Sequence, residues 1–453
     1  MMIMGRFAPV IFVIFTLSAK GVFNMEKLYI KGGKQLSGTI TVGGMKNAAD
    51  PIFCATLLTG SVCTIENVPD ADDLKNAGDI LTGLGAAVAY KGDNAYEIDT
   101  RYITEVNVPN EASKKLRSSY YLLGAGLGRF GKAEAGFPGG CDFGSRPIDQ
   151  HVKGFRALGA EVIEDHEAGR IRCSAPNGLR GASIYLDVPS VGATINIMLA
   201  ACRAEGTTVI DNAAREPHIV DVAMFLNSCG ADISGAGTPT IKIRGVSELS
   251  GTSYAVIPDM IEAGTYMVVA AATGSTLTVA NVIPRHLESI TAKLQEMGVN
   301  VEEGDDSMTV YAPEPNVEYR SIRVKTAFYP GFPTDMNPQF AVLLCLAKGE
   351  SRLTESVWAN RFQYVPELVR MGANITTNGS DAIITGIPAF HAANVRAVDL
   401  RAGAAMVIAA LATDGTTVVD DIHHILRGYE HIVEKLNSVG ADIRLVRLPD
   451  PMR

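Results

Sequence analysis

LTGLGAAVAY, residues 81–90, is one of six similar stretches spread along this 453-residue chain. Each stretch begins with the apolar end of a helical pattern, continues through glycine followed by alanine or valine, and ends in a short strand-like pattern. A glycine in that place favours the left-handed conformation that ends many helices. The other copies are FRALGAEVIE (155–164), FLNSCGADIS (225–234), LQEMGVNVEE (294–303), LVRMGANITT (368–377) and LNSVGADIRL (436–445).

An amphipathic helix is predicted before each of these glycines, which lie 68 to 74 residues apart. Leu84, Leu81, Ala77 and Leu74 fall one, four, eight and eleven places before Gly85, which is the spacing of one helix face. A second glycine lies 23 to 28 residues earlier in every copy, at the end of a uniformly apolar segment and the start of a strand. These second glycines are Gly60, Gly131, Gly206, Gly274, Gly349 and Gly415.

The two kinds of helix predict the fold class. Uniformly apolar helices are buried, whereas amphipathic ones line a core. Each copy is therefore expected to form strand, buried helix, strand, amphipathic helix, strand. Six such units predict an α/β protein of two domains, three units in each, with helices inside and sheets outside.

The composition excludes several function classes. Hydrophobic residues make up 47% and charged residues 20% of the chain, as in a globular protein, and the net charge of −9 argues against nucleic acid as a main partner. The seven cysteines are odd in number and include no CxxC pair, so we expect a reducing cytoplasm and no disulfide framework. The eight histidines form no metal-binding motif, and we expect no metal site.

Residues 1–24 carry Arg6 and an apolar run from Phe7 to Leu17. The run resembles a short signal peptide and is short for a membrane span. We interpret the segment as an extension outside the fold, which then begins at Met25.

Ionisable residues interrupt the repeat at the starts of the apolar helices. The residues fourteen places before the second glycines are Lys46, Arg117, Gly192, Met260, Asp335 and Arg401. Cations are unfavourable at the positive end of a helix dipole unless an anion joins them, so these helix starts predict a site for a phosphorylated or carboxylated ligand. Arg361 and His151 also replace apolar residues of the amphipathic helices, either as functional groups or as ordinary helix-end residues.

Nine motifs together carry a resemblance to a known family. They are GGMKNAA (43–49), LRSSYYLLG (116–124), FPGGCDFGSRPID (137–149), SVGAT (190–194), NAAREPHIVD (212–221), FPTDM (332–336), ANRF (359–362), DLRA (399–402) and RGYEHI (427–432). The chain resembles the UDP-N-acetylglucosamine 1-carboxyvinyltransferases, which are enolpyruvyl transferases of peptidoglycan synthesis in the EPSP synthase family. The resemblance covers residues 25–447 approximately.

The resemblance implies two inverse α/β barrels with the active site in the cleft between them. Residues 46–257 would form one domain, and residues 25–45 with 258–453 the other. The implied reaction transfers the enolpyruvyl group of phosphoenolpyruvate to the 3-hydroxyl of UDP-N-acetylglucosamine by addition and elimination, and releases phosphate. It needs no cofactor, and the enzyme would be cytoplasmic, a monomer or weak homo-oligomer, without nucleic-acid or membrane partners.

The resemblance also implies roles for residues of the matched motifs. Cys141 would be the proton donor, the group that forms an adduct with phosphoenolpyruvate and the target of fosfomycin, on a loop that closes over the site. Asp335 would take the proton of the 3-hydroxyl, with Lys46 and Arg427 also catalytic. Phosphoenolpyruvate would be bound by Lys46, Asn47, Arg146, Arg361, Arg401 and Arg427. UDP-N-acetylglucosamine would be bound by Asn47, Arg117, Arg146, Pro147, Ile148, Asp149, Gln150, Ser190, Val191, Gly192, Asp335 and Val357.

Three departures from the family pattern leave other functions open. Val188 stands where a lysine is common, Leu426 where an acidic residue is usual, and Asp50 where an apolar residue is usual. These departures indicate an altered affinity for the substrates. They also motivate the alternative hypothesis that the protein is a catalytically weak paralogue that binds sugar nucleotides as a regulator. An enolpyruvyl transferase acting on shikimate 3-phosphate is a further alternative, disfavoured by the PGGC loop.

Overall fold

All twelve glycines that mark the repeat have positive φ, from +57° at Gly60 to +108° at Gly415. The computed structural model describes residues 25–137 and 147–448. At Gly85, where φ is +105°, the amphipathic helix ends and the chain turns into a strand, as the sequence predicts. The repeat is thus a repeat of helix ends.

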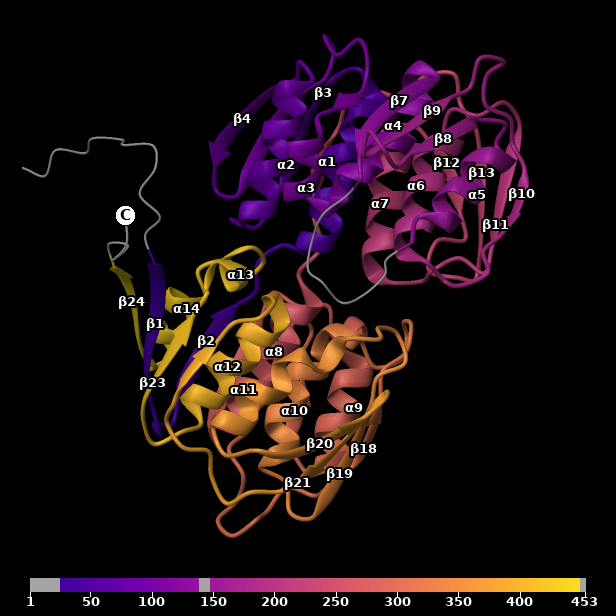
Figure 1. Cartoon of the computed structure of the whole chain (residues 1–453). Helices are drawn as coiled ribbons and strands as arrows, with labels where there is room; N and C mark the ends of the chain where they lie inside the picture. Colours follow the sequence, from indigo (N-terminus) through magenta and orange to yellow (C-terminus); the bar gives the residue numbers. More distant parts are fainter. Residues whose placement is uncertain (1–24, 138–146, 449–453) are drawn as a thin grey trace, which may run out of the picture.

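Two domains, each of three sheets around a group of helices, make up the molecule (Figure 1). The helices lie inside and the sheets outside, as predicted. The apolar helices are α1 (Lys46–Thr56), α4 (Tyr121–Phe130), α6 (Val191–Ala201), α8 (Met260–Ala272), α10 (Asn337–Cys345) and α12 (Leu400–Leu411). The amphipathic helices are α2 (Asp72–Gly83), α5 (Asp149–Ala157), α7 (Pro217–Ser228), α9 (Glu288–Met297), α11 (Val365–Arg370) and α14 (Ile432–Ser438).

Short helices complete the connections between these elements. They are α3 (Asn110–Lys115), α13 (His423–Leu426) and the 3₁₀ helices η1 (Leu57–Thr59), η2 (Arg117–Tyr120), η3 (Pro284–Leu287), η4 (Thr334–Met336) and η5 (Arg361–Tyr364). In the described part of the chain no helix has the length and apolar character needed to cross a membrane.

Each sheet has four strands. In the first domain the orders are β14 (Ser253–Ala255), β3 (Val62–Glu66), β5 (Ala95–Asp99), β4 (Ala87–Gly92); β6 (Asn107–Val108), β7 (Lys132–Gly136), β9 (Arg170–Ser174), β8 (Glu161–Asp165); and β10 (Ser183–Tyr185), β11 (Thr207–Asp211), β13 (Thr240–Arg244), β12 (Asp232–Ser234). In the second domain they are β16 (Val301–Glu303), β17 (Ser307–Val310), β15 (Thr276–Ala280), β2 (Ser37–Thr41); β18 (Arg323–Lys325), β19 (Glu350–Thr354), β21 (Asp381–Thr385), β20 (Asn374–Asn378); and β22 (Asn394–Arg396), β23 (Gly415–Asp420), β1 (Met25–Gly32), β24 (Asp442–Leu448).

The sheets correct the predicted unit, which contains one strand too few. After the amphipathic helix the chain forms a hairpin, such as β12 with β13, and the second strand of the hairpin pairs with the strand that follows the buried helix. In the sixth unit β1, from the beginning of the fold, takes the place of that second hairpin strand.

Two segments, residues 42–46 and 255–260, run between the domains side by side. The Met45 amide donates to the Ile257 carbonyl at 2.7 Å, and the Asp259 amide donates to the Gly43 carbonyl at 3.0 Å. Gly44 is required here, since a Cβ at this position would lie 1.6 Å from the Asn67 carbonyl oxygen. The crossing exchanges strands, because β2 pairs with β15 and β14 pairs with β3.

Candidate active site

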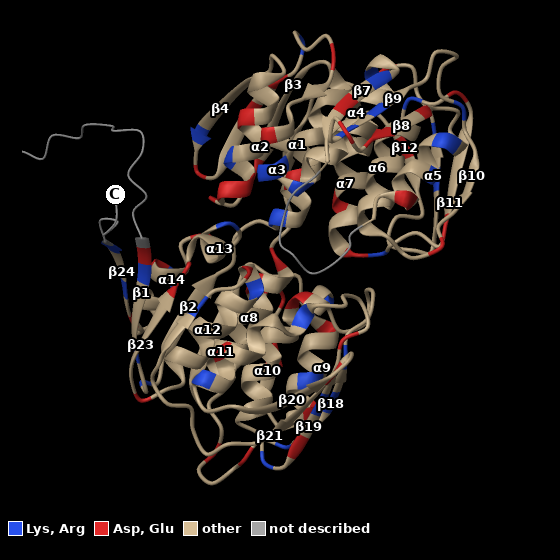
Figure 2. Ribbon diagram, viewed as in Figure 1, with Lys and Arg blue, Asp and Glu red and all other residues tan. Residues whose placement is uncertain are grey.

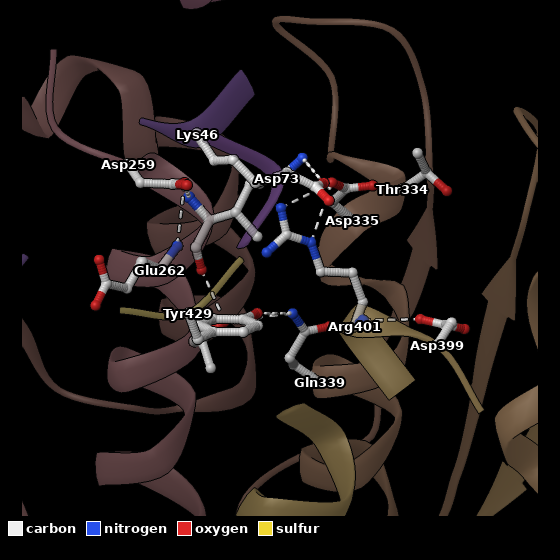
Figure 3. A network of polar contacts seen from close by, with 12 residues as sticks. Lys46, Asp73, Asp259, Glu262, Thr334, Asp335, Gln339, Asp399, Arg401 and Tyr429 are labelled. Carbon is white, nitrogen blue, oxygen red and sulfur yellow. Dashed lines mark hydrogen bonds and ion pairs between the residues drawn. The ribbon is translucent and has the colours of Figure 1, made fainter. Parts of the chain in front are cut away.

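The start of α1 places Lys46 among charged groups of both domains. The Lys46 ammonium lies 2.7 Å from Asp73 Oδ2 on α2 (Figure 3). It also lies 3.3 Å from Oδ2 of Asp50, one turn along α1. Asp73 Oδ1 also accepts a hydrogen bond of 3.0 Å from Nε of Arg427, which follows α13 in the second domain. Burial opposes the charge on Lys46, but Asp50 and Asp73 outweigh burial and raise the pKa of Lys46 above its usual value.

A second cluster surrounds Asp335 on η4, before the buried helix α10. Asp335 Oδ2 accepts a hydrogen bond of 3.1 Å from Nε of Arg401 and lies 3.1 Å from its Nη2, and Oδ1 lies 3.4 Å from Nη2 of Arg361. Both arginine side chains are buried, whereas 31% of the Asp335 side chain is exposed. The carboxylate is therefore held by two cations and still reaches solvent.

Each arginine is fixed by further contacts. Arg361 donates two hydrogen bonds to the Thr334 carbonyl, at 3.1 Å from Nε and 3.0 Å from Nη2. The Arg401 guanidinium lies over the ring of Tyr429, 5.3 Å from its centroid. Within the described residues, Nη1 of Arg401 is buried without a hydrogen-bond partner, which makes it a donor available to a bound anion.

Glu355 aligns this cluster, and sequence reasoning missed it. Its Oε2 accepts from the Thr334 hydroxyl at 2.9 Å and from Asn337 Nδ2 at 3.0 Å. Its Oε1 accepts from the backbone amide of Val357 at 2.8 Å. Asp73 was also missed, because an acidic residue in the first turn of a helix looks like ordinary capping.

A cavity of about 660 Å³ lies in the first domain, against α5. It does not include Asp335, Arg361 or Arg401 in its lining. Four of its lining residues were predicted to bind nucleotide. They are Arg117, Pro147, Ile148 and Asp149.

Five further predicted nucleotide residues, Gln150, Ser190, Val191, Gly192 and Asn47, lie at the starts of α5, α6 and α1. Gln150 Nε2 donates to Asp149 at 2.7 Å and to Asp187 at 3.0 Å, and its Oε1 accepts from the Asp187 amide. Ser190 caps α6 by accepting from the Ala193 amide at 3.3 Å, next to the half-buried residues Val191 and Gly192. Asn47 lies in the first turn of α1, beside Lys46.

His151 is a buried structural residue in this fold. Its Nδ1 lies 3.0 Å from Asn196 Nδ2, and its ring packs edge-on against Tyr120. Burial, with a smaller contribution from Arg117, lowers the pKa of His151 to about 3. The ring therefore stays neutral at ordinary pH.

Three parts of the sequence hypothesis lie outside the described residues. They are Cys141, Arg146 and the extension 1–24. The other six cysteines are free and buried. Of the three departures, Val188 is exposed, Leu426 is half-buried and Asp50 contacts Lys46.

Comparison with known proteins identifies the family. A model of the EPSP synthase (3-phosphoshikimate 1-carboxyvinyltransferase) family matches residues 30–436. This chain belongs to the EPSP synthase family. Within the EPSP synthase family, it is 52% identical to UDP-N-acetylglucosamine 1-carboxyvinyltransferase 2 of Clostridium acetobutylicum, over 93% of this chain and 99% of the relative. It is 53% identical to UDP-N-acetylglucosamine 1-carboxyvinyltransferase 3 of Caldanaerobacter subterraneus subsp. tengcongensis, over 93% and 100%.

Solved structures of an enolpyruvyl transferase and of an EPSP synthase have the same fold. The enolpyruvyl transferase NikO from Streptomyces tendae matches with a TM-score of 0.84 and 28% identity, over 94% of this chain and all of that one. EPSP synthase from Acinetobacter baumannii matches with a TM-score of 0.71 and 19% identity, over 93% and 100%, and this likeness concerns the fold alone. The predicted enolpyruvyl transferase fold is confirmed.

Proposed function

We propose that this protein transfers the enolpyruvyl group of phosphoenolpyruvate to the 3-hydroxyl of UDP-N-acetylglucosamine, a step of peptidoglycan synthesis, and releases phosphate. The carboxylate of Asp335, which is held by Arg361 and Arg401 and whose side chain is 31% exposed, carries the proposal. It gives a proton acceptor next to donors for an anionic substrate. Relatives that share half of the sequence are named for this reaction.

We assign the predicted substrate residues to two groups of side chains. Lys46, Arg361, Arg401 and Arg427 bind the phosphate and carboxylate of phosphoenolpyruvate, with Asn47 at the edge of this group and with Arg146 contributing from outside the described residues. The cavity lined by Arg117 and residues 147–149 supports binding of the nucleotide there, together with Gln150, residues 190–192 and Val357. Figure 2 shows both signs of charge on the facing ends of the domains, where such a site would form.

In the addition step, the 3-hydroxyl oxygen of the sugar bonds to C2 of phosphoenolpyruvate, and Asp335 accepts the proton of that hydroxyl. Cys141 delivers a proton to C3. In the elimination step, the bond from C2 to the phosphate oxygen breaks and C3 loses a proton, which restores the enol ether. The surrounding cations stabilise the negative charge of the departing phosphate. These steps need no metal or organic cofactor.

We also place the domain boundaries near residues 45 and 257, with the active site in the cleft between the domains. The paired crossing segments and the exchange of β2 and β14 support this division. The cysteine content supports a cytoplasmic location, and the net charge of −9 argues against nucleic-acid partners. A monomer or weak homo-oligomer without membrane partners stays an expectation from the family resemblance.

The test is phosphate release with phosphoenolpyruvate and UDP-N-acetylglucosamine, on wild type and Cys141→Ala, with and without fosfomycin. We expect release that requires both substrates, is lost in Cys141→Ala, and in wild type is abolished by fosfomycin. Folded protein that binds the nucleotide and releases no phosphate would instead be a regulator. Release with shikimate 3-phosphate as the preferred acceptor would assign the other enolpyruvyl transfer.

A further inference from the structure

Asp50 is a buried carboxylate in the middle of an otherwise apolar helix, with only 5% of the residue exposed. Its Oδ2 lies 3.3 Å from the Lys46 ammonium. Its Oδ1 is buried and has no hydrogen-bond partner among the described residues, and the nearby Ser118 hydroxyl does not reach hydrogen-bonding geometry. A buried carboxylate oxygen without a partner is unfavourable, so this side chain depends on Lys46.

Lys46 does not depend on Asp50 in the same way. Its shorter contact is to Asp73, at 2.7 Å, and Asp73 also binds Arg427. In this group of four the two cations are balanced by two carboxylates. Without the charge of Asp50 the group would carry a net positive charge, which favours an anionic substrate. Lys46 would still keep its contact with Asp73.

We propose that Asp50 is a positioning residue that holds the Lys46 ammonium back on α1, in competition with phosphoenolpyruvate, so that substrate binding releases this contact and Asp50 takes up a proton. The inference rests on the proposed function, because it assigns Lys46 to that substrate. The inference accounts for the buried carboxylate of Asp50, which the packing of α1 does not explain.

Among the described residues, Lys46 is the cation that forms an ion pair with Asp50. On α1 the other ionisable group is Cys54, on α2 it is Asp73, and on α4 it is Tyr121. Burial, opposed in part by Lys46, raises the pKa of Asp50 to about 6. When the ammonium turns to a substrate phosphate, the carboxylate loses its partner and its proton affinity rises further.

Asp50→Asn keeps the side-chain shape and removes the charge. At pH 8 we expect the KM for phosphoenolpyruvate to fall by about tenfold, equivalent to one pKa unit of interaction, with kcat changed less than the KM. Near pH 5 the wild-type carboxylate is largely protonated and the two KM values should converge. The ratio of the two KM values cancels the ionisation of the substrate itself.

The matched control is Asp79→Asn, which removes the same charge from an exposed position on α2 and should leave the KM unchanged. Asp50→Ala is the second variant, should the amide disturb the packing. Calorimetric titration of phosphoenolpyruvate in buffers of different ionisation enthalpy then counts protons. Wild type should take up more protons than Asp50→Asn at about pH 6.5, midway between the pKa of about 6 in the free protein and a value about one unit higher in the complex.

Any of three results would overturn the inference. The KM of the Asp50 variants could equal or exceed that of wild type, or Asp79→Asn could lower the KM as much as Asp50→Asn does. The third is equal proton uptake by wild type and Asp50→Asn. If wild type releases no phosphate, the proposed function fails by itself. The calorimetric Kd of phosphoenolpyruvate for the same proteins still decides the inference, and equal values reject it.

Discussion

Asp73 accepts a hydrogen bond of 3.0 Å from Arg427, although the two residues belong to different domains. The side chain of Asp73 is 6% exposed, and its second oxygen binds Lys46. Burial alone would raise the pKa of Asp73, but Lys46 and Arg427 together hold it below the usual range. One carboxylate therefore joins α1, α2 and the turn after α13.

Asp73→Ala should lower the free energy of unfolding by about 2 kcal/mol, because two cations lose a shared buried partner. Urea unfolding followed by circular dichroism measures this difference. Asp72→Ala removes the same charge from an exposed neighbour and should change stability by less than about 0.5 kcal/mol. Equal effects of the two substitutions would show that the domains do not depend on this contact.

Asp335→Asn should reduce kcat for phosphate release by a factor of about 10² to 10⁴, the usual contribution of a positioned general base. The amide keeps the shape of the side chain and cannot accept the sugar proton. The readout is kcat at saturating substrates, with Asp305→Asn, an exposed carboxylate of the same domain, as the control. A variant with wild-type kcat would remove Asp335 from the chemistry.

The buried carboxylate of Asp221 should make the free energy of unfolding depend on pH. This 1% exposed carboxylate accepts from the Tyr254 hydroxyl and from the Ile257 amide, next to a crossing segment. Burial outweighs these hydrogen bonds and raises its pKa to about 6, from a model-peptide value of 3.8. The protonated form is thus favoured in the folded state, and the associated stability is full below pH 4 and lost as the pH rises through 6.

Asp221→Asn lacks this titration. Its free energy of unfolding relative to wild type should increase on the order of 1 kcal/mol between pH 5 and pH 8. Urea unfolding at both pH values checks this, and Asp232→Asn, an exposed carboxylate of the same domain, should show no such change. A constant difference between variant and wild type would mean that Asp221 has its ordinary pKa.

Gly124→Ala tests the close approach of α4 and α6. A Cβ at Gly124 would lie 2.3 Å from the Asn196 carbonyl oxygen, so the buried helices would have to separate, at a cost of about 2 kcal/mol or more. At Gly83, in α2, nothing lies within 4 Å of the added atom, and Gly83→Ala should stabilise by up to about 1 kcal/mol. Thermal unfolding should therefore move in opposite directions for these two variants.

The sequence predicted the helix ends and the helix starts more securely than the contacts between them. Gly85 and its five counterparts could be recognised because glycine is favoured where φ is positive, and Arg361 because charge is rare on a packed helix face. Asp73 and Glu355 could not be recognised. Asp73 lies 354 residues from its partner Arg427. Glu355 lies 21 residues from Thr334 and 18 from Asn337, and no local sequence pattern encodes such pairs.

The exchange of strands between the domains also could not be predicted from local sequence patterns. β2 and β14 have the same place in their units, before a buried helix, and nothing in either strand states which sheet it joins. The missing hairpin strand is a different case. β13 has the alternation of a half-buried strand, TIKIR, and counting it would have given the correct unit.

The pairing of β1 with β23 and β24 has a consequence for the order in which the protein is made. A chain growing on the ribosome completes the sheets of the first domain when residues 253–255 emerge, since β14 supplies their last strand. β1 is synthesised before all of them and finds both its partners only after residues 415–420 and 442–448 have followed. The first domain can thus fold during translation, while the second is closed only when β24 has been synthesised and pairs with β1.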